Sequence, residues 1–363
     1  MRYLVTSTAG AGHYGPLAPF VRSFLRGGHE VLVAGPAALG PAVRDAGFWP
    51  VADPPAEEMA AVFARLPSLS HEEANRVVVG EVFARLDATA ALPRVREAIT
   101  TWRPDVVVHE SAEFAGPIAA ELHGVPHARV AIGLKAMERL MWDVAQPLLP
   151  GSCDLAAGPY LTLFPASLED PSVAGFARTA RFRDPSWARS RPDGSLVYVT
   201  FGSVAGGIPM VAGVYAAALT AVAGLDVPVL LSVGRDVDPA SFGPVPAHVR
   251  VEPWVDQAAV LASASAVVCH GGGGSTLGAL AAGVPLVLVP LFAEDQYINA
   301  RRVAAVGAGV VAPPDSIRPA LDTVLTDPTY RAAAERVAAE LATHPPTDTA
   351  AEVLAGYWSG VDR

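Results

Sequence analysis

Cysteine, lysine and long apolar runs are scarce in this chain of 363 residues. Two cysteines, Cys153 and Cys269, are too few, and too unlike a metal-ligand spacing, for a disulfide scaffold or a zinc site. Lys135 is the single lysine among 26 basic residues, which we interpret as a trace of a GC-rich genome rather than as chemistry. No apolar run reaches the roughly 20 residues that a membrane-spanning helix needs. We therefore expect no membrane span.

The chain is acidic, and it opens directly on an apolar strand. Its 26 basic and 36 acidic residues give a formal charge of −10 at pH 7, which argues against non-specific binding of nucleic acid. The first residues lack the basic region, apolar core and cleavage site of a secretory signal. These observations predict a soluble cytoplasmic protein without a nucleic-acid partner.

The length is sufficient for about two domains, each with its own core. Apolar strands alternate with helical segments in both halves, which predicts two doubly wound, Rossmann-like α/β domains that face each other across a cleft. We expect an N-terminal domain at 1–182, a charged linker at 183–194 and a C-terminal domain at 195–345. The last segment, 346–363, is predicted to be a helix that packs back on the first domain.

The most informative stretch of the sequence runs from Trp254 to Asn299. Within it an apolar run ends in His270, four glycines follow, and Ser275 and Thr276 come where a helix begins. Bare backbone N–H groups at a helix N-terminus suit an anion, most often a phosphate. The stretch therefore predicts a site for a phosphorylated ligand.

A second Gly-rich segment, residues 10–15, fits the G-x-G-x-x-G dinucleotide fingerprint and follows a strand, as that motif requires. The fingerprint also needs an acid after the second strand to hold the ribose hydroxyls. Here that strand runs into Gly35 and Pro36, and no acid follows until Asp45. We therefore expect no nicotinamide or flavin cofactor.

The residues of a known donor-binding box stand in this chain in matching order and spacing: Trp254, Gln257, the run from His270 to Thr276, Gly283, Pro285, Asp295, Gln296 and Asn299. They resemble the inverting GT-B glycosyltransferases, a family that includes plant UDP-sugar transferases and bacterial antibiotic and macrolide transferases. The match extends through the second domain and, more loosely, to the N-terminal strand–loop–helix with its His13. The resemblance implies the GT-B fold, a nucleoside diphosphate sugar as co-substrate, and no metal ion or other cofactor.

The box assigns a task to each of its residues. Trp254 offers a flat face on which a pyrimidine can stack, and Gln257 either sits beside the base or caps a turn. Asp295 and Gln296 are expected to bind sugar hydroxyls. The diphosphate is expected to be held by His270, in its cationic form once the diphosphate is bound, and by Gly272, Gly273, Gly274, Ser275, Thr276 and the weaker candidate Ser203.

One departure from the family bears on the donor. Plant members have a glutamate at the start of the helix after the Gly-rich turn, and its carboxylate binds the ribose hydroxyls. This chain has Leu277 and Gly278 there. In this respect it resembles bacterial transferases that use deoxythymidine diphosphate (dTDP) sugars. A dTDP donor is therefore favoured over UDP.

The resemblance places the catalytic base in the first domain, in the loop after the first strand, where this chain has His13. A neutral imidazole can take the proton of an acceptor hydroxyl as that oxygen attacks the anomeric carbon. The family supports this histidine with an aspartate at the end of a later strand. Here Glu110 occupies that place, and Glu113 is a poorer candidate for the same role. The alternatives without a catalytic role are a solvated loop histidine for His13 and a helix N-terminal acid for Glu110.

The acceptor is expected to lie against the first domain, where helical segments carry apolar, Met-containing faces: Met59, Phe63, Phe83, Met137, Met141 and Trp142. Such faces suit a large hydrophobic natural-product aglycone, and they also suit an ordinary core. The sequence does not identify the acceptor, and it leaves open whether the protein is a monomer or a homodimer.

Two other functions fit the same sequence. One is another GT-B enzyme, such as a nucleotide-sugar epimerase or a cell-wall precursor transferase. The other is a catalytically idle paralogue that binds a nucleotide sugar or assists a partner transferase. The presence of His13, Asp295 and Gln296 argues against the idle paralogue.

Overall fold

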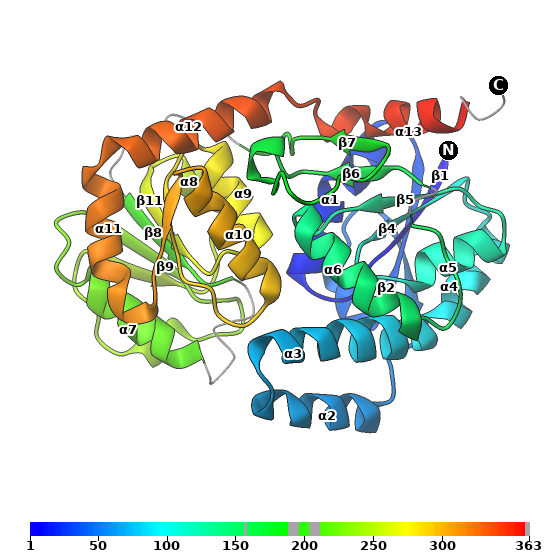
Figure 1. Ribbon diagram of the computed structural model, residues 1–363, viewed down its shortest axis with the longest axis horizontal. Helices are drawn as coiled ribbons and strands as arrows, with labels where there is room; N and C mark the ends of the chain where they lie inside the picture. Colours follow the sequence, from blue (N-terminus) through cyan, green and yellow to red (C-terminus); the bar gives the residue numbers. More distant parts are fainter. Residues whose placement is uncertain (156–157, 188–195, 203–210, 360–363) are drawn as a thin grey trace. The chain divides into compact units, whose positions relative to one another are not determined.

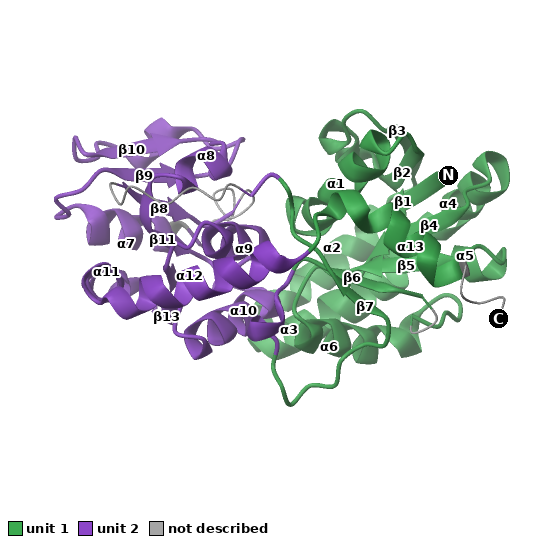
Figure 2. Cartoon of the chain, turned by 90° about the horizontal axis from the view of Figure 1, so that it is seen from above, with its two compact units in different colours: residues 1–163, 170–185, 345–363 green, residues 164–169, 186–344 purple. Residues whose placement is uncertain are grey.

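A computed structural model describes residues 1–155, 158–187, 196–202 and 211–359 (Figure 1). The chain divides into two compact units, each with its own sheet (Figure 2). Unit 1 comprises Met1–Leu163, Asp170–Pro185 and Pro345–Arg363, and unit 2 comprises Phe164–Glu169 and Ser186–His344. The prediction of two doubly wound α/β domains is confirmed in each unit taken by itself.

Unit 1 is built on a seven-stranded parallel sheet with the order β3-β2-β1-β4-β5-β6-β7. The chain adds strands outward from β1 to β3 and then returns to place β4 on the other side of β1. Ligands of such sheets bind beyond the carboxyl ends of the two strands where the order reverses. The strands are β1 (Arg2–Thr6), β2 (Glu30–Pro36), β3 (Gly47–Val51), β4 (Val106–Glu110), β5 (His127–Val130), β6 (Tyr160–Thr162) and β7 (Thr179–Arg181).

The connections of unit 1 are mostly helical, as the apolar periodicity of the sequence predicts. One continuous helical stretch passes from α3 through a π-helical segment, η3, into α4. The helices are α1 (Ala11–Arg26), η1 (Ala37–Ala42), α2 (Ala56–Arg65), η2 (Leu66–Ser68), α3 (His71–Val77), η3 (Val78–Asp87), α4 (Ala88–Trp102), α5 (Ala115–Leu122), α6 (Lys135–Ala145), η4 (Gln146–Leu148), η10 (Thr347–Thr349) and α13 (Ala350–Ser359).

The core of unit 1 forms where α4 and α5 cover one face of the central strands (Figure 1). Leu4 of β1 and Val107 of β4 are fully buried there, against Val95 of α4 and Ala119 of α5. Strands that are covered on both faces read as continuous apolar runs, which explains the sequence of β4. The apolar body of β4 leaves its polar residues, His109 and Glu110, at the carboxyl end of the strand.

Unit 2 repeats this plan with a six-stranded parallel sheet of order β10-β9-β8-β11-β12-β13. The order reverses between β8 and β11, whose last residues, Thr200 and Cys269, are partners in the register. The elements are β8 (Leu196–Thr200), α7 (Ala212–Val222), β9 (Val229–Ser232), η8 (Pro239–Phe242), β10 (Val249–Glu252), α8 (Gln257–Leu261), β11 (Ala264–Cys269), α9 (Gly273–Ala281), β12 (Leu286–Leu288), α10 (Glu294–Ala305), β13 (Gly309–Val311), η9 (Pro314–Ser316), α11 (Ile317–Thr326), α12 (Pro328–Thr343) and the separate turn η5 (Ala166–Leu168).

The C-terminal segment contacts α1, and the structure groups it with unit 1 from Pro345 onward. Ser23 Oγ donates a hydrogen bond to the Thr347 carbonyl, and Arg26 forms an ion pair with Asp348. Tyr357 of α13 donates to the Arg178 carbonyl. These contacts join the two ends of the chain within one unit.

The unit boundaries differ in detail from the ranges predicted from the sequence. Residues 164–169, within the expected first domain, are grouped with unit 2, because Arg302 of α10 donates to the carbonyls of Leu168 and Glu169. In the expected linker, Arg183 bridges to Pro346 in unit 1, and residues 188–194 lie outside the described part.

Candidate functional site

His13 lies in the first turn of α1, directly after the loop that follows β1. Gly10 adopts a φ of 111° and serves as the N-cap of this helix, and its carbonyl accepts hydrogen bonds from the N–H groups of His13 and Tyr14. A residue with a Cβ would be strained at that φ, so Gly10 sets the point at which the helix starts. The turn places His13 at the carboxyl edge of the sheet, beside the end of β4.

Glu110, the last residue of β4, is fully buried and holds the imidazole of His13. Its Oε1 lies 3.1 Å from His13 Nδ1 and also accepts from the Thr8 hydroxyl at 2.9 Å. Its Oε2 accepts from the Ala112 N–H at 2.5 Å. Burial opposes its ionisation, but the charge of His13 and these hydrogen bonds hold the pKa of Glu110 below its usual value. The structure therefore brings together the two residues that the sequence singles out as base and support.

Glu113 is engaged elsewhere. It accepts from the Thr6 hydroxyl and from the N–H groups of Ala115 and Gly116, at 2.8 and 2.9 Å, at the start of α5. Burial is the main cause that raises the pKa of Glu113 to about 7. Its hydrogen bonds tie β1 to α5, and none of them reaches His13.

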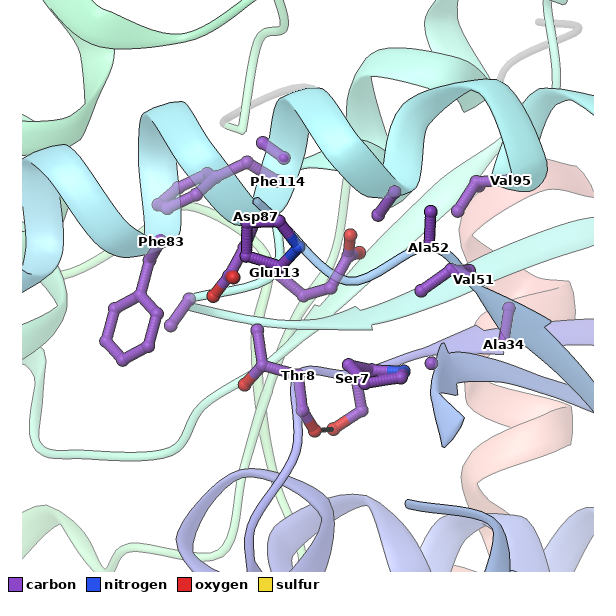
Figure 3. Close-up of a pocket in the computed structure, with 16 residues that line it drawn as sticks. Ser7, Thr8, Ala34, Val51, Ala52, Phe83, Asp87, Val95, Glu113 and Phe114 are labelled. Carbon is purple, nitrogen blue, oxygen red and sulfur yellow. Dashed lines mark hydrogen bonds between the residues drawn. The ribbon is translucent and has the colours of Figure 1, made fainter. Parts of the chain in front are cut away.

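A small pocket, lined entirely by residues of unit 1, opens beside His13 and Glu110 (Figure 3). Ser7 and Thr8 form its floor, Val51 and Val95 contribute apolar walls, and Phe83 and Asp87 reach it from η3. The rest of the lining consists of Ala34, Gly35, Pro36, Ala52, Pro54, Ala88, Ala91, Ala112, Glu113 and Phe114. The Phe83 ring meets the His13 ring edge-on, with 5.2 Å between centroids. The pocket therefore adjoins the histidine that Glu110 holds.

Among the six residues expected to form an acceptor surface, only Phe83 lines this pocket. Met59 and Phe83 pack against a small cluster of Val62, Val82 and Leu86. Met137 and Met141 are buried in unit 1, Trp142 is partly exposed, and Phe63 is half exposed. Sequence reasoning missed Asp87 and the small residues after β2 and β3, which carry no motif and are joined only by the fold.

In unit 2 the Gly-rich turn follows β11 and begins α9. Gly272 is the N-cap of this helix, and no side chain of the described residues caps it, so its first N–H groups suit an anion. Gly273 and Gly274 form the first two positions, and Ser275 stands at the third. Thr276 is fully buried, so its hydroxyl points into the protein.

His270 lies beneath this turn and is almost fully buried. A Cβ added at Gly272 would lie 2.4 Å from its Nε2, and one at Gly202 would lie 3.0 Å from its Cε1. Burial lowers the pKa of His270 to about 4, and its Nδ1 has no hydrogen-bond partner within the described part of the chain. The imidazole is therefore neutral at pH 7 in these buried surroundings, and the cationic form expected from the sequence requires an anion to stabilise it.

Trp254 is 53% exposed on the loop after β10. The guanidinium carbon of Arg235 lies 4.2 Å from the centroid of its ring, so one face of the indole is occupied by a cation. Gln257 Nε2 donates to the Gly274 carbonyl at 3.3 Å. A Cβ at Gly278 would lie 2.5 Å from that same nitrogen. Gln257 therefore fills the space that a side chain at 278 would need.

The pair expected to bind sugar hydroxyls begins α10. Asp295 is partly exposed in the first turn. Gln296 is buried, and its Oε1 accepts from the N–H groups of Leu291 and Phe292 at 2.8 and 3.2 Å. Its carbonyl oxygen thus shapes the loop after β12. Ser203, the weaker phosphate candidate, lies outside the described residues.

Comparisons with known proteins identify the family of the chain. The family described as erythromycin biosynthesis protein CIII-like matches through its N-terminal domain at residues 22–148 and through its C-terminal domain at residues 216–355. The chain belongs to this family. The resemblance to antibiotic and macrolide transferases predicted from the sequence is therefore confirmed.

Relatives cover nearly the whole chain. L-demethylnoviosyl transferase of Streptomyces niveus is 33% identical, and elloramycin glycosyltransferase ElmGT of Streptomyces olivaceus is 32% identical, each over 98% of both chains. The solved structure of glycosyltransferase VinC in complex with dTDP has a TM-score of 0.75 at 25% identity, over 98% of this chain and 99% of that one. The protein is a GT-B glycosyltransferase of natural-product biosynthesis.

The helices of the described residues agree with the absence of a long apolar run in the sequence. None of them is long and apolar enough to cross a membrane.

Proposed function

We propose that the protein transfers a sugar or deoxysugar from a dTDP-sugar to a hydroxyl group of a hydrophobic natural-product acceptor, with inversion at the anomeric carbon. The observation that carries this proposal is the hydrogen bond between His13 Nδ1 and buried Glu110 at the carboxyl edge of the unit 1 sheet. The Gly-rich turn before α9 supports it from unit 2, since its uncapped N–H groups suit a diphosphate.

His13 acts as the general base in this scheme. Its Nε2 takes the proton of the acceptor hydroxyl while that oxygen forms a bond to the anomeric carbon. The bond between the anomeric carbon and the diphosphate oxygen breaks on the opposite face of the sugar. Glu110 fixes the tautomer of His13 and stabilises the imidazolium that forms. General base catalysis of this kind contributes about 10²–10⁴-fold to the rate.

The departing diphosphate carries the negative charge of the reaction. We assign its stabilisation to the N–H groups at the start of α9, to the hydroxyl of Ser275 and to His270. His270 is neutral before the donor binds, and the arriving diphosphate favours its protonation. These groups stabilise the developing charge, and the scheme uses no metal ion.

A dTDP donor is supported by two observations. Gln257 fills the space beside Gly278, where plant relatives carry the glutamate that grips the ribose. VinC, which is similar over nearly the whole chain, was solved in complex with dTDP. The face of the Trp254 ring opposite Arg235 is the surface on which we expect the thymine to stack.

The test is an incubation of the protein with dTDP- and UDP-sugars and a panel of hydrophobic hydroxylated acceptors, with products identified by mass spectrometry. We expect glycosylated acceptor with the dTDP donors, and loss of nearly all turnover in His13→Ala. Near-wild-type turnover of that variant would refute the assignment of the base. Nucleotide binding without transfer to any acceptor would favour an idle paralogue, and release of an epimerised sugar without acceptor would favour an epimerase.

A further inference from the structure

The continuous helix from α3 to α4 contains the ten-residue π-helical segment η3. Such segments are rare and occur frequently at functional sites. Two side chains of η3, Phe83 and Asp87, line the pocket of unit 1 (Figure 3). Since Phe83 also contacts the ring of His13, the segment brings a carboxylate into the neighbourhood of the proposed base.

Asp87 differs from the other carboxylates nearby in its hydrogen bonding. Glu110 is held by His13 and by loop N–H groups, and Glu113 is held by Thr6 and by N–H groups of α5. In contrast, no hydrogen bond or ion pair holds Asp87 within the described ranges, and its interactions with His13, Glu110 and Asp53 are electrostatic. Its oxygens are therefore the ones available to a ligand of this pocket.

The surroundings of Asp87 make a hydrogen-bond donor favourable there. Three charged groups face it: His13 on α1, Glu110 on β4 and Asp53 on the loop after β3. Burial and the two acids raise the pKa of Asp87 to about 6, against the opposing effect of His13. The carboxylate is ionised at pH 7 but poorly solvated, and such a group gains from a ligand hydroxyl that donates to it.

We propose that Asp87 is an acceptor-binding residue that takes a hydrogen bond from a second hydroxyl of the acceptor, adjacent to the hydroxyl that His13 deprotonates. This assignment rests on the proposed function of His13 and narrows the acceptor class to compounds with two neighbouring hydroxyl groups. Phe83 and the apolar walls formed by Val51 and Val95 then contact the carbon skeleton next to that diol (Figure 3). One hydroxyl is oriented by Asp87 and the other reacts.

The test compares two probes, 7,8-dihydroxyflavone and 7-hydroxyflavone, which differ only in the second hydroxyl. Their Kd values are measured by calorimetry on the full-length protein saturated with dTDP, and kcat/KM is measured with dTDP-glucose. We expect the wild type to bind the dihydroxy probe about tenfold more tightly, as for a hydrogen bond to a charged group. In Asp87→Asn, which preserves the shape and removes the charge, the preference should fall to about threefold or less.

Asp53→Asn is the matched control, because Asp53 is an exposed acid near the same charges that does not line the pocket. It should keep the wild-type preference, and thermal unfolding should show that both variants are folded. The proposal is overturned if the wild type binds both probes equally or binds neither, if Asp87→Asn keeps the preference, or if Asp53→Asn loses it equally. An Asp87-dependent binding preference without any sugar transfer would instead leave the inference intact and refute the proposed reaction.

Discussion

The hydrogen bond between His13 and Glu110 joins two residues that are 97 positions apart in the chain. Glu110 is buried and ionised because the His13 ring, the Thr8 hydroxyl and the Ala112 N–H all donate to it. A carboxylate so placed can act only through the imidazole that it orients. Its contribution to function should therefore appear in turnover and not in donor binding.

We expect Glu110→Gln to lower kcat by about 10²–10⁴-fold, because the amide removes the charge and can present an N–H to the imidazole, which disfavours the required tautomer. Steady-state kinetics with a dTDP-sugar measure the loss, and calorimetry with dTDP should show an unchanged Kd. Glu57→Gln, a change at an exposed position of α2, serves as the control. An unaltered kcat in Glu110→Gln would contradict the role assigned to Glu110.

His270 predicts a pH dependence of stability. Its pKa is lowered to about 4 by burial, so between pH 6.5 and 4 the unfolded chain binds a proton that the folded chain does not. This contribution to stability is complete above pH 6.5 and is lost as the pH falls. Between pH 7.5 and 5 the wild type should lose about 2 kcal/mol more than His270→Asn. Urea unfolding of both proteins at the two pH values measures the difference, and equal losses would count against a neutral, buried His270.

The Gly-rich turn and α9 form the element on which the donor site depends. Gly272 has an ordinary φ of −61°, so a side chain there is excluded by the His270 ring and not by the backbone. At Gly274 an added Cβ would meet nothing within 4 Å. Two positions of one turn, separated by a single residue, therefore differ sharply in what they tolerate.

Gly272→Ala should destabilise the protein by about 1–3 kcal/mol, since the Cβ forces the buried imidazole to move. Gly274→Ala, at the second position of the same helix, should be neutral or stabilising by up to about 1 kcal/mol. Thermal and urea unfolding of the two variants provide the comparison. The packing argument fails if both substitutions have the same effect on the free energy of unfolding.

The helices and strands could be predicted from the sequence where an apolar periodicity or a turn residue defined them. The stretch from 264 to 299 folds as the predicted strand, Gly-rich turn, helix and strand, because its glycines and apolar runs act locally. The π-helical register of η3 had no such signal, so the arrival of Asp87 at the pocket could not be predicted. The hydrogen bond that Gln296 accepts inside the protein could not be predicted for a similar reason. Its partner belongs to a loop whose path is set by tertiary packing.

Across the whole molecule, the proposed chemistry is divided between two units with separate sheets and cores. The residues assigned to proton transfer and to the acceptor belong to unit 1, and those assigned to the nucleotide belong to unit 2. Since donor binding then depends on one core and base catalysis on the other, variants in the two units should affect different steps.

His13→Ala should abolish nearly all turnover and leave the Kd for dTDP unchanged. Trp254→Ala should weaken dTDP binding by about tenfold through the loss of stacking, at little cost in stability because the indole is half exposed. Calorimetry with dTDP and steady-state kinetics on both variants measure the two effects. If His13→Ala weakened dTDP binding as strongly as Trp254→Ala does, the division of tasks between the units would be wrong.

The close approach of Gln257 to Gly278 also constrains how this chain can change over time. An added Cβ at 278 would lie 2.5 Å from the Gln257 amide nitrogen, which itself bonds to the Gly274 carbonyl. Because that nitrogen is the free end of a flexible side chain, a residue larger than glycine at 278 would turn the Gln257 amide away and break its bond to the Gly274 carbonyl. The first cost of a larger residue at 278 would therefore be the loss of this bond to the Gly-rich turn, and a single substitution there would change the turn and the helix start together.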